Sequence, residues 1–195
     1  MKKTKTNEKE IIFNKLSIDH QIKTGNKLRD LRNILLLAVN VVSKATGISD
    51  STIDRIEKGD VGVGSGRIYS LISFYGFEYQ DFFKFSRPLP TEDQLRRQMK
   101  RFHEQNGCDA YKIIYSQPDL ITLIEHKLLK TELFNDWVIE KTVYKFCEEN
   151  FGYQYNSILN TLDLAVKKQF LIHEENSSPK RFKMNPVLLK EIDLM

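Results

Sequence analysis

The chain has 195 residues, of which 41% are hydrophobic and 11% aromatic, so it holds enough apolar material for a packed core. Its formal net charge of +4 is compatible with nucleic acid as a partner. The longest apolar run, around residues 34–42, is too short to span a membrane, and the basic first residues lack the apolar stretch of a secretion signal. We therefore expect a cytoplasmic protein with no membrane partner.

Residues that could carry catalysis or bind a metal are scattered along the chain. The two cysteines, Cys108 and Cys147, lack the CxxC spacing of a zinc site, and the four histidines have no partners at ligand spacing. We expect Cys147 to pack on the inner side of a helix. No nucleophile–base pair or metal-ligand set can be assembled, so the sequence predicts no catalytic residues, no metal and no cofactor, and we expect the protein not to be an enzyme.

The first half of the chain has the apolar spacing of a series of short helices. Residues 1–19 are expected to form a basic tail, and helices are expected over 24–35 and 39–46. Gly47 can take the left-handed conformation that ends a helix, and Ser49 is a favourable N-cap for a third helix over 49–58. In that third helix the apolar residues share one face, and its outer face is left for a partner.

A glycine-rich connection over residues 60–66 follows the third helix. It lacks the Lys-Ser or Lys-Thr pair of a phosphate-binding loop, so we interpret it as a flexible link between helices. Beyond it, the spacing predicts a fourth helix over 67–75 and a short fifth helix that contains Phe82 and Phe83.

Three blocks of residues occur in this half with a characteristic order and spacing. They are Lys27-Leu28-Arg29-Asp30-Leu31-Arg32, then Gly47-Ile48-Ser49, Ser51-Thr52-Ile53 and Arg55-Ile56-Glu57-Lys58-Gly59, then Ile68, Leu71, Ile72, Gly76 and Phe82-Phe83. Together they resemble the Cro/repressor-type helix-turn-helix domain, the xenobiotic-response-element family of bacterial and phage regulators. The resemblance implies a five-helix domain over residues 20–86, a recognition helix presented to the major groove of DNA, and a homodimer.

Two features depart from the usual pattern of that family. Asp50 and Asp54 place carboxylates on the outer face of the expected recognition helix, where they would repel phosphates unless they pair with Arg55 or accept from a cytosine amino group. The apolar residues 35–37 replace a polar turn, and we expect this patch to be exposed on the isolated domain and to pack on another domain or chain.

The second half has its own organisation. Residues 87–109 are expected to be a linker with a basic amphipathic helix, and 110–195 a separate domain. In that domain the patterns predict a strand over 110–115, and helices that begin near Pro118, at Asn135 or Asp136, and at Ser157. Strands over 170–173 and 181–184, joined by a polar turn, are expected to complete it.

Three helices followed by a two-stranded hairpin is the order of elements in a winged helix. The segment Asn160-Thr161-Leu162 with Phe170-Leu171-Ile172 resembles the recognition-helix-into-wing segment of bacterial winged-helix regulators. The predicted fold class is therefore mostly α, with a five-helix repressor-like helix-turn-helix domain followed by a winged-helix domain that carries a small β-hairpin.

These patterns favour a sequence-specific transcriptional regulator that binds double-stranded DNA as a dimer, with no small-molecule effector indicated. The predicted DNA-binding residues are Lys27, Asp50, Ser51, Thr52, Asp54, Arg55, Lys58, Asn160, Thr161, Lys167, Lys168, Lys180 and Arg181. The alternative is a protein-interaction or antitoxin-like adaptor, whose helix-turn-helix modules mediate assembly rather than DNA reading. The acidic Asp50 and Asp54 favour this alternative, and the basic residues near 180 favour the regulator.

Overall fold

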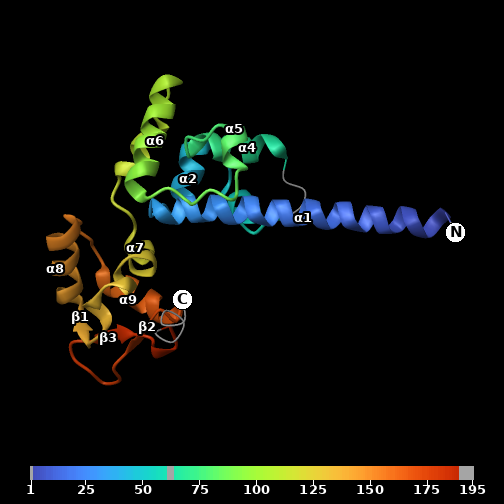
Figure 1. Cartoon of the computed structure of the whole chain (residues 1–195). Helices are drawn as coiled ribbons and strands as arrows, with labels where there is room; N and C mark the ends of the chain where they lie inside the picture. Colours follow the sequence, from blue (N-terminus) through green and yellow to red (C-terminus); the bar gives the residue numbers. More distant parts are fainter. Residues whose placement is uncertain (1, 61–63, 189–195) are drawn as a thin grey trace. The chain divides into compact units, whose positions relative to one another are not determined.

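A computed structural model describes residues 2–60 and 64–188 of the chain, with side chains from residue 15 onward. The chain divides into two compact units, Met1–Ser116 and Gln117–Met195, which are described separately below as unit 1 and unit 2. Most of the described residues are helical, and unit 2 holds a three-stranded antiparallel sheet (Figure 1). The expectation of a mostly α protein with a small β element is confirmed.

The first helix of unit 1, α1 (Lys2–Ile34), is much longer than expected. The prediction of a basic tail over residues 1–19 is wrong for the backbone, because residues 2–24 contain no Gly or Pro and favour continuous helix. Gly25 does not start the helix. A Cβ at this position would lie 2.3 Å from the carbonyl oxygen of Ile56, so the glycine lets α1 lie directly against the next helices.

The turn between the second and third helices has the predicted geometry. The helix α2 (Val39–Thr46) ends at Gly47, which has φ of 72° in the left-handed region, and Ile48 is buried in the turn. The third helix, α3 (Asp50–Glu57), buries Ile53 and Ile56 as predicted. Ser49 holds the N-cap position, but its hydroxyl pairs with the hydroxyls of neighbouring residues instead of capping the backbone, which corrects the prediction.

The helices α4 (Ser65–Phe74) and α5 (Tyr79–Phe82) complete the expected five-helix order. The glycine-rich connection before α4 lies partly outside the described residues, at 61–63. Leu35 and Leu37 belong to the hydrophobic core of unit 1, so the prediction of an exposed apolar patch is wrong for these two residues. The chain reverses between α1 and α2 there, and this turns both leucines inward.

The segment expected to be a linker is part of unit 1. The helix α6 (Glu92–Gln105) starts with a capping box between Thr91 and Gln94, and Leu95 and Met99 are fully buried in the core. Residues 110–115 form the 3₁₀ helix η1 (Ala110–Tyr115) rather than a strand. The guanidinium of Arg96 donates to the carbonyl of Ile114, and this bond ties η1 to α6.

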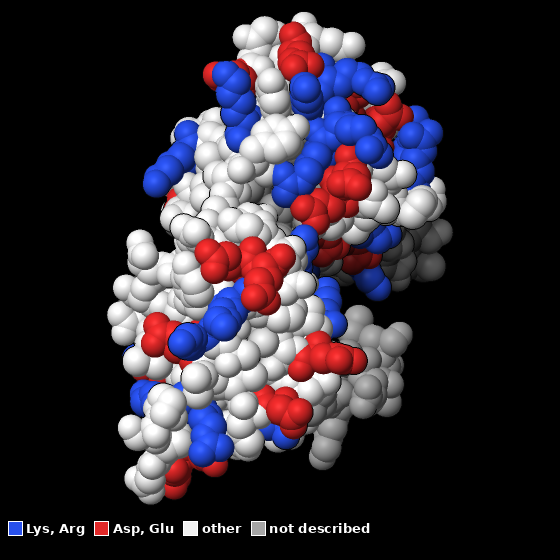
Figure 2. Space-filling model, turned by 90° about the vertical axis from the view of Figure 1, so that its left-hand side faces the viewer, with Lys and Arg blue, Asp and Glu red and all other residues white. Residues whose placement is uncertain are grey.

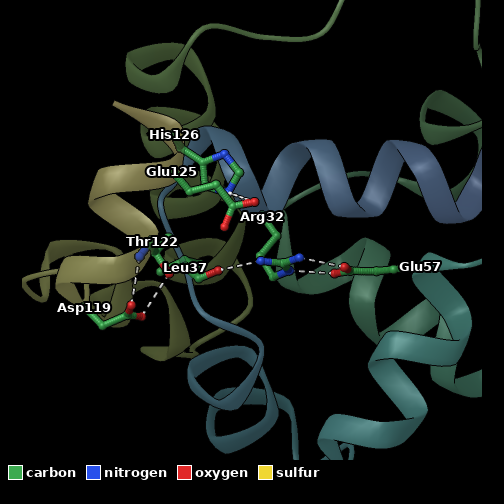
Figure 3. A network of polar contacts seen from close by, with 7 residues as sticks. All are labelled: Arg32, Leu37, Glu57, Asp119, Thr122, Glu125 and His126. Atoms are coloured by element: carbon green, nitrogen blue, oxygen red, sulfur yellow. Dashed lines mark hydrogen bonds and ion pairs between the residues drawn. The ribbon is translucent and has the colours of Figure 1, made fainter. Parts of the chain in front are cut away.

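Unit 2 begins with α7 (Leu120–His126), whose N-cap Asp119 accepts from the backbone N–H and the hydroxyl of Thr122 (Figure 3). The short 3₁₀ helices η2 (Leu128–Lys130) and η3 (Glu132–Phe134) follow. The strand β1 (Val138–Ile139) then precedes α8 (Glu140–Phe151), where the sequence predicts helix from residue 135.

The helix α9 (Ile158–Lys167) leads into the hairpin of β2 (Leu171–His173) and β3 (Arg181–Met184), close to the predicted bounds. The strand order is β1-β3-β2, with both pairs antiparallel, so β1 adds a strand that the sequence patterns missed. Two residues give too short a pattern for alternation to be recognised. The buried side chains of Leu171, Phe182 and Met184 turn one face of this sheet inward.

A buried ion pair joins α1 to α3 inside unit 1. The guanidinium of Arg32 donates from Nε and Nη2 to the two carboxylate oxygens of Glu57, each at 2.8 Å, and from Nη1 to the carbonyl of Leu37 at 3.0 Å (Figure 3). The exposed fractions of the two side chains are only 13% and 6%. Both charged groups are therefore satisfied away from water, and the pair holds α3 in place.

We expect Glu57→Ala to destabilise unit 1 by about 3–5 kcal/mol, because it leaves the Arg32 guanidinium buried without its carboxylate. The measurement is hydrogen exchange of the α3 backbone amides in the full chain. The matched control is Asp60→Ala, which breaks the exposed Arg55–Asp60 pair and should cost less than about 1 kcal/mol. Equal exchange rates in the two variants would contradict the structural role of the buried pair.

Candidate nucleic-acid interface

The outer face of α3 is one of two candidate surfaces, and its charges are balanced. Ile53, Ile56 and Glu57 are buried, which leaves the opposite side of the helix exposed. The predicted residues Asp50, Ser51, Asp54, Arg55 and Lys58 lie on that exposed side, and Thr52 is half-buried. Two carboxylates therefore offset the two cations, and the surface offers no net positive charge to phosphates.

Arg55 is also engaged within its own unit. Its Nε lies 3.2 Å from the carboxylate of Asp60, and the side chains of both residues are about half exposed. An exposed pair of this kind contributes less than about 1 kcal/mol, so Arg55 can exchange this partner for another anion. Asp60 is not among the residues predicted from the sequence, because it lies beyond the helix end and nothing in the local pattern marks it.

The structure corrects the prediction that Lys27 contacts DNA. Lys27 is only 9% exposed, and its Nζ donates to the carbonyl oxygen of Phe82 and lies 4.7 Å from the centre of the Phe82 ring. Burial is the main cause that lowers the pKa of the Lys27 amine, and the nearby charge of Arg87 lowers it further. The local sequence places Lys27 on α1 but does not show its burial, which depends on the contact with Phe82 of α5.

The outer face of α9 is the second candidate surface, and it is polar and basic. Ile158, Leu162 and Ala165 are buried, so they anchor the helix from one side. Successive exposed positions on the other side, three or four residues apart, fall along one stripe. These exposed residues are Asn160, Leu164, Lys167 and Lys168, with the predicted Thr161 half-buried beside them.

The hairpin beside α9 carries the two remaining predicted residues. Lys180 Nζ lies 3.0 Å from a carboxylate oxygen of Asp163 on α9, and Arg181 Nε lies 3.1 Å from the carboxylate of Glu174. Both pairs are partly exposed, so both cations can move to a phosphate at small cost. Local sequence patterns do not identify Asp163 and Glu174 as partners, since each meets its cation only when the hairpin folds back.

A further group of basic side chains lies on α6. Arg97, Lys100 and Arg101 are exposed, and Lys100 lies 3.9 Å from Glu104 one turn away. Figure 2 shows one face of the molecule on which Lys and Arg gather in the upper part, at the level of α6 in Figure 1, with Asp and Glu among them. The mixture of signs makes this a solvated surface rather than a continuous basic patch.

The cysteines differ sharply in their surroundings. Cys147 is completely buried on α8, as predicted, and burial raises the pKa of its thiol to about 11. Cys108 is exposed. Among the described side chains, of residues 15–60 and 64–188, no three His, Cys, Asp or Glu gather as a metal site would need. No helix in the described part of the chain has the length and apolar character to cross a membrane.

Comparisons with known proteins identify no relative of this chain. No family model, no curated protein and no solved structure matches the chain. The resemblance to the Cro/repressor-type and winged-helix regulators therefore stays a prediction.

We expect the two thiols to differ in reactivity toward Ellman's reagent at about pH 8, because only a thiolate attacks the reagent and Cys147 is both buried and neutral. The native chain should release one equivalent of product, and the chain in denaturant two. Cys108→Ser should abolish the native reaction. A fast native reaction in that variant would contradict the described packing of α8 in unit 2.

Proposed function

We propose that this chain is a transcriptional regulator that binds double-stranded DNA sequence-specifically as a dimer, and that α9 with the β2–β3 hairpin makes the principal contact. The observation that carries the proposal is the outer face of α9. It combines an amide, an apolar side chain and two lysines along one exposed stripe, namely Asn160, Leu164, Lys167 and Lys168.

The topology of unit 2 supports this assignment. Its elements follow the order α7, β1, α8, α9, β2, β3, and β1 pairs with β3 at the edge opposite β2. This is the order of a winged helix, in which the third helix is the recognition helix and the hairpin is the wing. An α-helix of this kind fits the major groove of B-DNA, which is about 12 Å wide.

The chemistry of the exposed stripe suits both parts of DNA recognition. An asparagine amide can donate to and accept from adenine, and an apolar side chain can contact the methyl group of thymine. Asn160 and Leu164 would supply these base contacts. Among the described residues, neither Lys167 nor Lys168 forms an ion pair, although Lys168 Nζ lies 5.7 Å from the centre of the Phe170 ring. Both charges are therefore available to phosphates.

Unit 1 would supply a second contact with DNA, directed at the bases rather than at the phosphates. The arrangement of α2, the turn at Gly47 and α3 supports a repressor-like helix-turn-helix, whose exposed face carries Asp50 and Asp54. Carboxylates repel phosphates but accept hydrogen bonds from the amino group of cytosine. We therefore assign α3 a role in base selection and assign most of the electrostatic affinity to unit 2.

The alternative function is a protein-interaction adaptor, and two observations favour it. The charges on the outer face of α3 cancel, and α1 exposes apolar side chains that a partner could cover. Leu16 is 58% exposed, Ile18 45% and Ile22 41%. In this alternative the helix-turn-helix units would mediate assembly with another protein, and DNA binding would be weak and unselective.

We expect the full chain to shift a labelled fragment of its own upstream region in a gel, with a scrambled fragment as competitor. The double variant Lys167→Gln/Lys168→Gln should bind at least about tenfold more weakly, because two positive charges near the phosphates are removed. The slope of log K against log salt should also fall by about 0.9 for each phosphate that the variant no longer neutralises.

The matched control for that experiment is Lys112→Gln/Lys130→Gln. It removes the same charge from exposed lysines that lie outside both candidate surfaces, and it should leave the affinity close to that of the parent chain. An equal loss of affinity in both double variants would mean that binding follows net charge alone. That result, or binding that is insensitive to salt, would reject the proposed interface.

Arg55→Glu tests the assignment of α3. Because Arg55 is already paired with Asp60 on a charge-balanced face, we expect the substitution to weaken DNA binding by less than about fivefold and to alter the preferred base sequence more than the affinity. The measurement is selection of binding sites from a random duplex pool by the parent and variant chains. Complete loss of binding would instead make α3 the principal contact.

A further inference from the structure

A pocket in unit 1, separate from both candidate DNA surfaces, has the features of a small-ligand site. It has a volume of about 440 Å³ and lies among α1, α5 and the start of α6. Ligand pockets in proteins typically measure about 300–1,000 Å³. The residues that matter for its chemistry are Lys27, Phe77, Asp81, Arg87, Leu89 and Gln98.

The unusual member of this set is Lys27. It is only 9% exposed, and no described carboxylate forms an ion pair with it. An ammonium group has three N–H donors, and the carbonyl oxygen of Phe82 accepts from one of them. The rings of Phe77, Phe82 and Phe85 surround the Lys27 Nζ at 4.7–5.6 Å from their centres.

The aromatic rings stabilise the cation but cannot accept its remaining hydrogen bonds as an anion would. A buried charge without a counter-ion is costly, and the lowered pKa of the Lys27 amine is consistent with that cost. Arg87 lines the same pocket, and its positive charge is one of the causes that lower this pKa. A ligand carboxylate would offset both effects, because it attracts both cations.

The other charges of the pocket limit the ligand to a single negative charge. Glu78 and Asp81 also line it, so two carboxylates stand against two cations. Asp81 is already engaged with Lys84 at 2.5 Å and with Arg87 at 3.4 Å. A polyanion such as a nucleotide would meet strong repulsion from Glu78 and Asp81, whereas one carboxylate directed at Lys27 would meet less.

The apolar side chains that line the pocket favour a ligand with an apolar body. Phe77, Pro88, Leu89 and Pro90 line it, and Leu89 is 40% exposed although it is a large apolar residue. Covering such a side chain is favourable by roughly 25 cal/mol for each Å² removed from water. The pocket thus combines two cations with several apolar side chains, and this combination matches an amphipathic acid.

We propose that this pocket binds a small monocarboxylic acid, with its carboxylate at Lys27 and Arg87 and its apolar body against Phe77, Leu89 and the flanking prolines. The site lies entirely within unit 1 and does not depend on the proposed DNA binding. It would give the chain a binding partner of low molecular weight, for which the sequence patterns provided no indication.

The test is calorimetric titration of the full chain with benzoate, and with benzamide as the uncharged analogue of the same shape. Benzoate should bind with Kd near or below about 1 mM, and benzamide at least about tenfold more weakly, because only benzoate carries the carboxylate. Inorganic phosphate should also bind more weakly than benzoate, since it lacks the apolar body. Equal affinity for benzoate and benzamide, or tighter binding of phosphate, would overturn the proposal.

Two variants assign the binding to the pocket. Lys27→Met keeps the length of the buried side chain without its charge, and Arg87→Gln removes the second cation at an exposed position that the fold does not need. Each should weaken benzoate binding, by at least about tenfold and about threefold respectively, with Lys112→Gln as the unchanged control. If Lys27→Met fails to fold, Arg87→Gln decides. Unaltered benzoate binding in the folded variants would reject the site, whatever the outcome of the DNA experiments.

Discussion

The buried ion pair between Arg32 and Glu57 fixes the geometry on which the first unit depends. Burial alone would lower the pKa of Arg32, but the hydrogen bonds and charge of Glu57 outweigh that effect, and the pKa is raised. A third bond, to the carbonyl of Leu37, includes the turn between α1 and α2 in the same contact (Figure 3). Because both partners are satisfied only in this arrangement, α3 cannot rotate without leaving a charge buried and unpaired. The close approach of Gly25 to the backbone of Ile56 reinforces this position.

The helices α3 and α9 are anchored in their units in the same way but differ in the charge of their exposed sides. Each unit holds its helix from one side through buried aliphatic residues and leaves the other side exposed. On α3 the exposed side chains cancel in charge, and Arg55 is paired within the unit. On α9 the acidic Asp163 is paired with Lys180, which leaves Lys167 and Lys168 to define the charge of the stripe. This difference is the basis of the proposal that unit 2 supplies the DNA affinity and unit 1 the selectivity or assembly.

Local signals in the sequence predict much of the fold. The turn at Gly47, the helices on either side and the strand over Arg181–Met184 follow from patterns within a few residues. Some errors are local, such as the helix over residues 2–19, and others concern contacts between distant parts of the chain. Local patterns assign Lys27 to DNA, because its burial depends on Phe82, which lies 55 residues away. They predict the helix α6 but treat it as part of a linker, because its core contacts through Met99 require α4 and α5 to be in place. The sequence predicts the candidate site as a set of exposed positions. The ion pairs formed by Arg55, Lys180 and Arg181 can be recognised only in the three-dimensional structure.

The proposed function depends above all on contact between double-stranded DNA and α9 with the β2–β3 hairpin. Hydrogen exchange of the full chain, followed by mass spectrometry, with and without a duplex from its own upstream region, measures this contact segment by segment. We expect slower exchange in peptides that cover residues 157–184, a smaller effect over α3, and no change in α7, whose inner face is buried. An unchanged pattern over 157–184 while the duplex is bound, with protection confined to other segments, would contradict the proposal.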